Sequence, residues 1–301
     1  MPRNKDHKHH YVPQFYLRNF AIDEEKKKIA TVGKHGSRAI WSIRSIKGLG
    51  WEHDLYVHLR RGVPVSVESV INDQIEIPIS QSDTWAKIVS NKTDTLDRSD
   101  KPILYALIKH LETRSPHYRA TAMELAQLAA DPDSEIPFTE EERELYAYLR
   151  TNKNSTKEFF NLKASSLEWS EQDYSKASVM VFRSPIPLRS SSVPVLTMNV
   201  PEHPALHLPL PGTKPYQLVL PLNPTTIVCL VIADFDDNFI NAEISLDEAL
   251  GFNRQYVCQF SNFDQVRHLI TGREDIEAEM AWAQYQLIEE NKRSITFRKR
   301  N

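Results

Sequence analysis

The chain has 301 residues, of which 41% are hydrophobic and 26% charged, and its formal net charge is -3 at pH 7. This composition is typical of a globular protein that buries a sizeable core, in one large domain or in two of ordinary size. The weak negative charge excludes nucleic-acid binding driven by overall charge, so such binding would need a local basic patch.

The two cysteines, Cys229 and Cys258, have no spacing that indicates a disulfide framework or a metal site, and we expect both to be reduced and buried. The N-terminus is polar, and no apolar run reaches the roughly 18 residues of a membrane span. We therefore predict a cytoplasmic protein with no membrane association. The sequence contains neither GxxxxGK[ST] nor GxGxxG, which argues against a nucleotide P-loop or a dinucleotide cofactor.

The beginning of the chain combines a short helix with a small β region. A helix is predicted over residues 14–20, and β-branched and aromatic residues predict strands over 28–34 and 39–46. Beyond Pro64 the apolar spacing becomes helical, and Pro78 is expected to break or restart that helix.

The middle of the chain is predicted to be helical. Pro102, Ser115-Pro116 and the capping box from Thr139 to Glu142 each mark a helix start. Proline fits the first helical turn, and a capping box satisfies backbone donors there. The helices that start at Ser115-Pro116 and Thr139 should end near residues 130 and 150.

From residue 177 the pattern changes to strands separated by prolines and polar turns. The predicted strands cover 177–183, 193–199, 216–220, 225–233 and a short segment within 265–270. A second capping box, from Ser245 to Glu248, begins a helix to about residue 260, and a final helix is predicted over 273–291.

Together these elements predict an α+β fold with a small N-terminal β element, a helical middle region and a β-rich C-terminal part with capping helices. The predicted divisions are residues 1–63, 64–170 and 171–301, which could also form one continuous domain.

One stretch, KHHYVPQFYLRNF at residues 8–20, places titratable and hydrogen-bonding side chains among aromatic ones. Imidazole changes charge near neutral pH, so His9 or His10 could act as a catalytic base. Adjacent residues of a strand point to opposite faces, so the pair is not expected to bind one metal ion. The competing interpretation is that both histidines are hydrogen-bonded within the core.

The motif HHYVPQFYLRNF resembles the signature opening of a largely bacterial family of uncharacterised proteins, domain of unknown function 4238. Later segments are similar to further landmarks of that family: Glu52–Tyr56, Leu111–Pro116, Leu220–Pro224 and Asn253. The chain departs from the family pattern at Ser192 and Val193, where the family has aspartate and asparagine. If that aspartate bound a metal or oriented a histidine, this chain lacks it. The resemblance covers nearly the whole chain and implies no established activity.

Two arginines are predicted to bind substrate, Arg18 and Arg114, because guanidinium groups match the geometry of phosphates and carboxylates. Arg114 and His117 flank the helix break at Ser115-Pro116, where free N–H groups would favour an anion. The alternative for Arg114 is a salt bridge to a helix carboxylate such as Glu112.

Three further side chains complete the predicted site. Gln14 and Asn253 are predicted to bind substrate, and Asp54 is a predicted ligand for a divalent metal, Mg or Mn, if the protein uses one. The order His-His-x-x-Pro is also similar to the core of HNH nucleases, although the cysteine pairs typical of those nucleases are absent. Trp41 and Trp51 lie near basic residues, a pattern that either stacks bases or covers a small core.

Three classes of function remain open. The favoured one is a nuclease or other phosphodiesterase that uses His9 or His10 as its base, because titratable and phosphate-matching side chains are concentrated in one segment. The second is a non-catalytic recognition subunit of a bacterial defence or toxin system that binds a protein or nucleic acid. The third is a sensor for a small anionic ligand.

Overall fold

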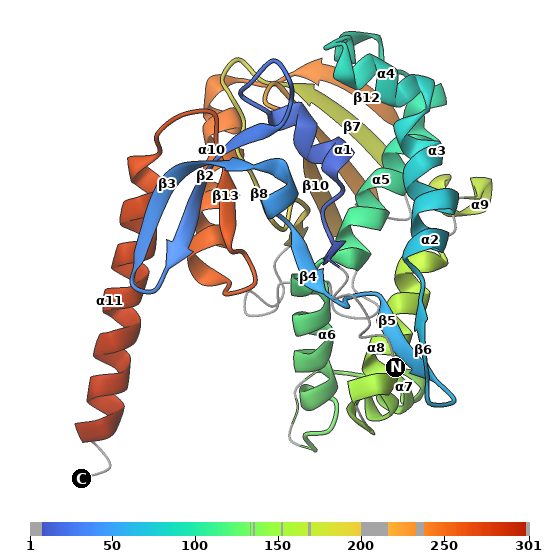
Figure 1. The fold of residues 1–301 in the computed structure, drawn as a ribbon, viewed down its shortest axis with the longest axis vertical. Helices are drawn as coiled ribbons and strands as arrows, with labels where there is room; N and C mark the ends of the chain where they lie inside the picture. Colours follow the sequence, from blue (N-terminus) through green and yellow to red (C-terminus); the bar gives the residue numbers. More distant parts are fainter. Residues whose placement is uncertain are drawn as a thin grey trace, which may run out of the picture.

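The computed structural model describes residues 8–132, 134, 136–151, 153–167, 170–199, 216–232 and 238–298, and its fold is α+β as predicted (Figure 1). The strands are β1 (Lys8–His10), β2 (Lys28–His35), β3 (Arg38–Ser45), β4 (Trp51–His53), β5 (Val57–Arg60), β6 (Val63–Ser66), β7 (Ala177–Arg183), β8 (Ser190–Ser191), β9 (Leu196–Asn199), β10 (Tyr216–Asn223), β11 (Thr226–Ile232), β12 (Phe239–Glu243) and β13 (His268–Ile270). The α-helices are α1 (Gln14–Leu17), α2 (Glu68–Ile71), α3 (Ile77–Ser80), α4 (Asp83–Val89), α5 (Lys101–Arg114), α6 (Pro116–Leu128), α7 (Glu140–Thr151), α8 (Lys153–Ser165), α9 (Glu171–Tyr174), α10 (Leu246–Asn262) and α11 (Ile276–Arg298). Across the described residues, no helix has the length and apolarity needed to cross a membrane.

The larger sheet has the strand order β12-β7-β11-β10-β9, in which β12 and β7 run parallel and the other neighbours are antiparallel. Its central strands are buried on both faces. Leu218 and Leu220 of β10 pack in the same core as helix α5, whereas Val219 between them packs with residues of α10. Because both faces need apolar side chains, β11 has the continuous apolar run seen in the sequence. Residue 233, the predicted end of that strand, lies outside the described residues.

The second sheet has the strand order β3-β2-β13-β8 and joins the early hairpin to strands from the end of the chain. Helix α11 packs along β3 and β2 and then extends away from the body, as Figure 1 shows. The three-part division of the chain stays a prediction, and its first and third parts share this sheet.

The helix starts follow the predicted chemistry. The Ser115 hydroxyl accepts a hydrogen bond from the Tyr118 N–H at 2.9 Å, and Ser245 forms a reciprocal capping box with Glu248. Pro78 lies in the first turn of α3, directly after a π-helical turn. The wider π turn changes the hydrogen-bond spacing where proline has no N–H to donate, so the chain stays helical there.

Several elements and one side chain differ from the sequence prediction. The hairpin β5–β6, helix α8 and strand β12 were not predicted, because they are short or largely polar. Cys229 is buried as predicted, but Cys258 on α10 is exposed, so the prediction of two buried thiols is wrong for the second. Burial raises the pKa of the Cys229 thiol to about 12.

Gly50 lies where the strand β4 approaches the opening motif. Its φ is +62°, and a Cβ atom placed there would lie 2.8 Å from the Cβ of Val12. Replacement by alanine is expected to destabilise the fold by about 3 kcal/mol, from left-handed backbone strain together with overpacking. Gly36 is the matched control, because its φ is +59° and nothing lies within 4 Å of its added Cβ. Chemical denaturation should give a loss of only about 1 kcal/mol for Gly36→Ala, and equal losses at the two positions would contradict the close-approach argument.

Candidate functional site

The opening motif begins with the three-residue strand β1, which pairs with β4 in a two-stranded sheet. In this ladder His9 lies opposite Glu52 and His10 lies opposite Trp51. The chain then turns inward, and the Tyr11 N–H donates to the Gly50 carbonyl at 2.7 Å. Because this pairing is short, side-chain hydrogen bonds provide much of what fixes the segment.

His9 is 1% exposed and both of its ring nitrogens are engaged. The Tyr56 backbone N–H donates to Nδ1 at 3.0 Å, and Nε2 lies 3.2 Å from a carboxylate oxygen of Glu68. This pattern requires the proton on Nε2 and the lone pair on Nδ1. The ring also stacks on that of Tyr56 at 5.5 Å between centroids. His9 therefore has no nitrogen left to act on a substrate in this arrangement.

His10 is half-buried and is held differently. Its carbonyl accepts hydrogen bonds from the Arg114 guanidinium and from the Tyr56 hydroxyl, the latter at 3.2 Å. Its ring is hydrogen-bonded to the backbone of Lys47, and its Nε2 is buried with no hydrogen-bond partner in the described residues. Burial lowers the pKa of His10, and the nearby Arg114 adds to this effect.

Arg114 links the motif to the helical region. Its Nε donates to the Tyr56 hydroxyl at 2.5 Å, and its Nη1 donates to Glu76 and lies 2.7 Å from Nε2 of His110. The side chain is almost fully buried. Arg114 therefore has a carboxylate partner, as the alternative prediction expected. The partner is Glu76 and not Glu112, which pairs with Lys109.

This buried network changes the pKa of two of its members. Burial alone raises the pKa of Glu76, but Arg114 and His110 outweigh burial and lower that pKa to about 2. Burial lowers the pKa of His110 to about 4, and the adjacent guanidinium acts in the same direction. His110 is therefore neutral at pH 7 and accepts a hydrogen bond from Arg114.

The depressed pKa of His110 predicts a loss of stability in acid. As pH falls below about 6.5, His110 is protonated first in the unfolded chain, because the folded protein resists protonation until about pH 4. Protonation of only the unfolded state lowers the free energy of unfolding, by up to about 3 kcal/mol for this one group. Urea denaturation between pH 7 and pH 4 should show this slope.

The variant His110→Gln removes the titrating group and isolates its contribution. We expect the variant to be less stable at pH 7 but to take up about one proton fewer on unfolding between pH 6.5 and 4. An unchanged pH slope in the variant would contradict this role of His110.

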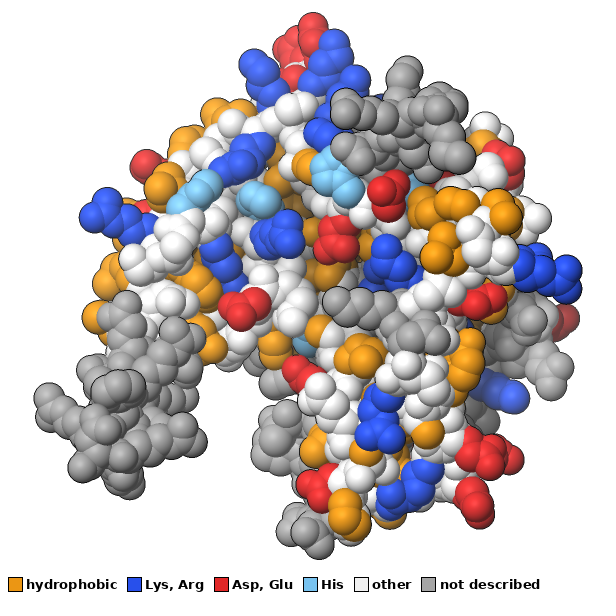
Figure 2. Space-filling view, turned by 60° about the horizontal axis from the view of Figure 1, so that its bottom comes forward, with side chains coloured by type: hydrophobic (Ala, Val, Ile, Leu, Met, Phe, Trp, Pro, Cys, Tyr) orange, Lys and Arg blue, Asp and Glu red, His pale blue; other side chains and the backbone are white. Residues whose placement is uncertain are grey.

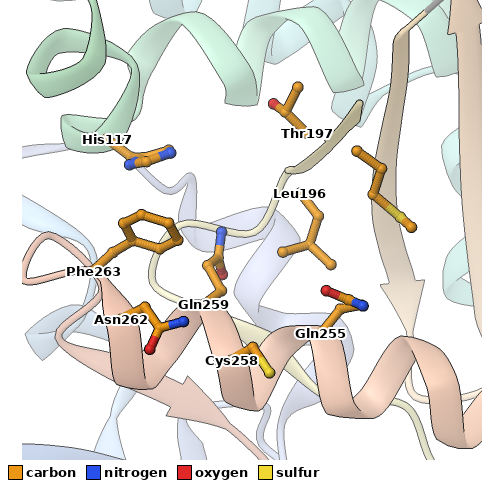
Figure 3. A pocket seen from close by; sticks show the side chains of 9 residues that line it. His117, Leu196, Thr197, Gln255, Cys258, Gln259, Asn262 and Phe263 are labelled. Atoms are coloured by element: carbon orange, nitrogen blue, oxygen red, sulfur yellow. The ribbon is translucent and has the colours of Figure 1, made fainter. Parts of the chain in front are cut away.

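The remaining predicted site residues lie on other elements, where Gln14 and Arg18 occupy the two ends of the same short helix. Arg18 is exposed at the end of α1, and Gln14 is half-buried at its start. Asp54 lies in the turn between β4 and β5 with a φ of +49°. Asn253 lies on α10 and bonds the backbone of the segment before β8. His117 lines a separate pocket (Figure 3). The structure thus brings together His9, His10 and Arg114 but not the other five.

A different group of polar side chains surrounds an open hollow of about 440 Å³ next to the opening motif. The polar and aromatic residues that line it are Tyr11, Trp51, Glu52, His53, Arg267 and His268. Figure 2 shows histidine, basic and acidic side chains gathered on this face of the molecule. Arg267 and His53 are exposed, whereas Glu52 and His268 are half-buried. The hollow therefore presents a cation and two imidazoles to solvent.

Two side chains in the wall of this hollow, His268 and Tyr11, have shifted pKa values. Burial lowers the pKa of His268 to about 4, and the neighbouring Arg44 and Arg267 act in the same direction, so His268 is neutral at pH 7. Burial raises the pKa of the Tyr11 hydroxyl to about 12, so it stays protonated. The Trp51 ring is covered by the Lys8 ammonium at 4.2 Å and contacted edge-on by His53.

Arg119 lies near the start of α6, and part of its guanidinium makes no hydrogen bond to the described residues. Its Nε and Nη2 atoms are buried and make no hydrogen bond to the residues that the structure describes. Burial lowers the pKa of Arg119, and Tyr56 and Glu52 partly offset this. These two N–H groups form the edge of the guanidinium that binds a carboxylate or phosphate in bidentate fashion. Glu52 lines the hollow, so Arg119 adds positive potential behind its wall.

Potential metal ligands do not cluster in the described part of the chain, where no group of three or more His, Cys, Asp or Glu side chains could hold an ion. Asp54 in particular is not part of such a group among the described residues. The predicted metal role of Asp54 therefore stays a prediction.

Comparison with known proteins identifies the family. The family model described as protein of unknown function, DUF4238, matches residues 8–266. The chain belongs to DUF4238. No curated protein and no solved structure matches it.

The position at which this DUF4238 chain departs from the expected family pattern lies beside the hollow. The Ser192 hydroxyl accepts hydrogen bonds from the backbone N–H groups of Arg267 and His268, at 3.1 and 3.2 Å. A carboxylate could accept the same two N–H groups. In this chain the Ser192 hydroxyl accepts both N–H groups and so holds the segment that lines the hollow.

Most of the side chains that line the hollow are not marked by any local sequence pattern. Arg267 and His268 belong to no motif, and nothing local in the Glu52–Tyr56 segment indicates a role for His53. Only the fold brings these three side chains together. Tyr56 lies within a segment that resembles a family landmark, yet nothing local shows that it contacts Arg114. The single available signal was the spacing of His110 and Arg114, four residues apart on one helix, which places them on the same face.

Proposed function

We propose that this DUF4238 protein is a phosphodiesterase that acts on nucleic acid, and that the hollow is its active site. The observation that carries the proposal is that Arg267, His53 and His268 line one open hollow together with Glu52. A guanidinium binds phosphate oxygens, and an imidazole can remove a proton at neutral pH. The local cation compensates for the weak negative charge of the whole chain.

In this proposal each side chain has one role. Arg267 binds a non-bridging phosphate oxygen and stabilises the charge that grows on it in the transition state. His53 removes the proton from the attacking water or hydroxyl as its oxygen forms a bond to phosphorus. The bond from phosphorus to the departing oxygen breaks, and that oxygen takes a proton from solvent, which reaches the open hollow. His268, being neutral, orients the attacking group by accepting its hydrogen bond.

The paired histidines then have a positioning role. His9 and the backbone of His10 are held by Tyr56, Glu68 and Arg114, and they fix the β1–β4 ladder that forms one wall of the hollow. In this proposal the polar side chains of the opening motif build the site and do not react with the substrate. The earlier expectation that His9 or His10 is the base remains testable in the same assay.

Purified protein should be incubated with labelled RNA, single-stranded DNA and duplex DNA, in EDTA, Mg²⁺ or Mn²⁺. The expected result is cleavage of at least one substrate, and the metal arms show whether a divalent ion is required, as the metal prediction at Asp54 implies. Cleavage of none of the three under all conditions would overturn the phosphodiesterase proposal.

A second candidate function is recognition of nucleic acid or protein without cleavage. It is favoured by one observation, that His9 and Arg114, whose chemistry first indicated catalysis, are both engaged within the fold. Filter binding with the same nucleic acids separates this candidate from the enzyme, because it predicts retention of intact strands. Saturable binding of inorganic phosphate alone would instead support the sensor of a small anion.

A further inference from the structure

We infer that a second pocket, close to the hollow, binds one unpaired nucleobase, so that the substrate is a single-stranded nucleic acid. The pocket has a volume of about 160 Å³ and lies between the start of α6, strand β9 and the end of α10 (Figure 3). This inference rests on the proposed function and specifies its substrate class.

The walls of the pocket suit a flat aromatic ring. His117 and Phe263 form one wall, with ring centroids 4.7 Å apart and planes inclined at 52°. Leu196 and Thr197 of β9 lie on the other side in Figure 3. A planar heteroaromatic ring would pack between an aromatic and an aliphatic surface, which is how proteins hold bases that have left a stack.

Amide side chains from α10 line the floor. Gln259 is already fixed, because its amide donates to the Val193 carbonyl and accepts from the Ser191 hydroxyl. Gln255 and Asn262 are exposed, and neither makes a side-chain hydrogen bond to another described residue. Each carries both a donor and an acceptor, which is the combination that reads a base edge.

The chemistry of the pocket also indicates which part of a nucleotide it takes. Among the residues that the structure describes, its lining includes no lysine, arginine, aspartate or glutamate, so these residues provide no ammonium or guanidinium group for a phosphate. Its volume is below the roughly 300 to 1,000 Å³ of pockets for larger ligands. A single neutral ring with polar edges fits these properties better than a whole nucleotide.

The pocket and the hollow are connected by one short segment. Phe263 lines the pocket and Arg267 lines the hollow, four residues further on. Four residues span at most about 14 Å when extended, and the bond from the Val266 N–H to the Phe263 carbonyl shortens this segment further. A base in the pocket would therefore lie within a few nucleotides of a phosphate at Arg267.

A paired duplex cannot satisfy this arrangement. Its bases are stacked and hydrogen-bonded to each other, and a base enters a side pocket only after being unstacked and unpaired, which costs a few kcal/mol. A single strand needs no unpairing, so we expect it to be preferred.

Binding of the four ribonucleosides, which lack phosphate, tests the pocket separately from the hollow. Titration of adenosine, guanosine, cytidine and uridine, followed by NMR or calorimetry, should show saturable binding of at least one. Gln255→Ala and Asn262→Ala should each weaken that binding roughly tenfold, because each removes hydrogen bonds to the base edge. Arg254→Ala is the matched control, being exposed on α10 but lining a different pocket.

The outcomes separate the two proposals. Nucleoside binding that is weakened in both variants while no nucleic acid is cleaved would keep the base pocket and overturn the phosphodiesterase. Cleavage without saturable nucleoside binding, or nucleoside binding unchanged in both variants, would overturn the base pocket and leave the phosphodiesterase standing.

Discussion

Replacing Arg114 by methionine is expected to lower the free energy of unfolding by about 3 to 5 kcal/mol, because it leaves a largely buried carboxylate without its cation. Glu76 is the carboxylate concerned, and Arg114 is also the main reason that its pKa is low despite burial. Tyr56 and the His10 carbonyl lose a donor in the same variant. The measurement is chemical denaturation at pH 7, with folding confirmed by circular dichroism.

The double variant Arg114→Met with Glu76→Gln provides the control. It removes both charges, so the double variant should be more stable than Arg114→Met alone, although less stable than the unmodified protein. If the two substitutions simply add, the ion pair does not account for the loss, and the hydrogen bonds of Arg114 to the opening motif do.

If the proposed mechanism holds, replacing Arg267 by alanine is expected to reduce the rate of phosphodiester cleavage by about 100-fold to 1,000-fold, because in that mechanism Arg267 stabilises charge in the transition state. Alanine at His53 should reduce the rate by about 100-fold to 10,000-fold through loss of the base. Both side chains are exposed, so neither change should lower stability by more than about 0.5 kcal/mol.

A matched control for Arg267→Ala comes from the β2–β3 hairpin, where Arg38→Ala changes an exposed arginine outside the hollow. This control should cleave at the unmodified rate. If activity is lost in His10→Ala while Arg267→Ala stays fully active, the reaction centre lies at the paired histidines, as the sequence predicted, and not in the hollow.

Capping motifs and continuous apolar runs were enough to predict several helix starts and one strand from the sequence alone. The capping residues at Ser115, Thr139 and Ser245 marked the starts of α6, α7 and α10, since each hydroxyl has a backbone donor within three residues. The continuous apolar run of β11 likewise predicted a strand, which the sheet buries on both faces. The opening motif was sufficient to indicate the family.

The role of each polar side chain was decided only by tertiary structure. The sequence shows two adjacent histidines and an arginine far along the chain, but not that Tyr56, Glu76 and Glu68 would use up their hydrogen-bonding groups. The hollow likewise depends on β4 and β13 lying close together, which no local pattern encodes. Hydrogen bonds between residues distant in sequence form only when the sheets pack. Composition and motifs therefore indicated which reactive side chains the protein has, and packing decided which of them face solvent.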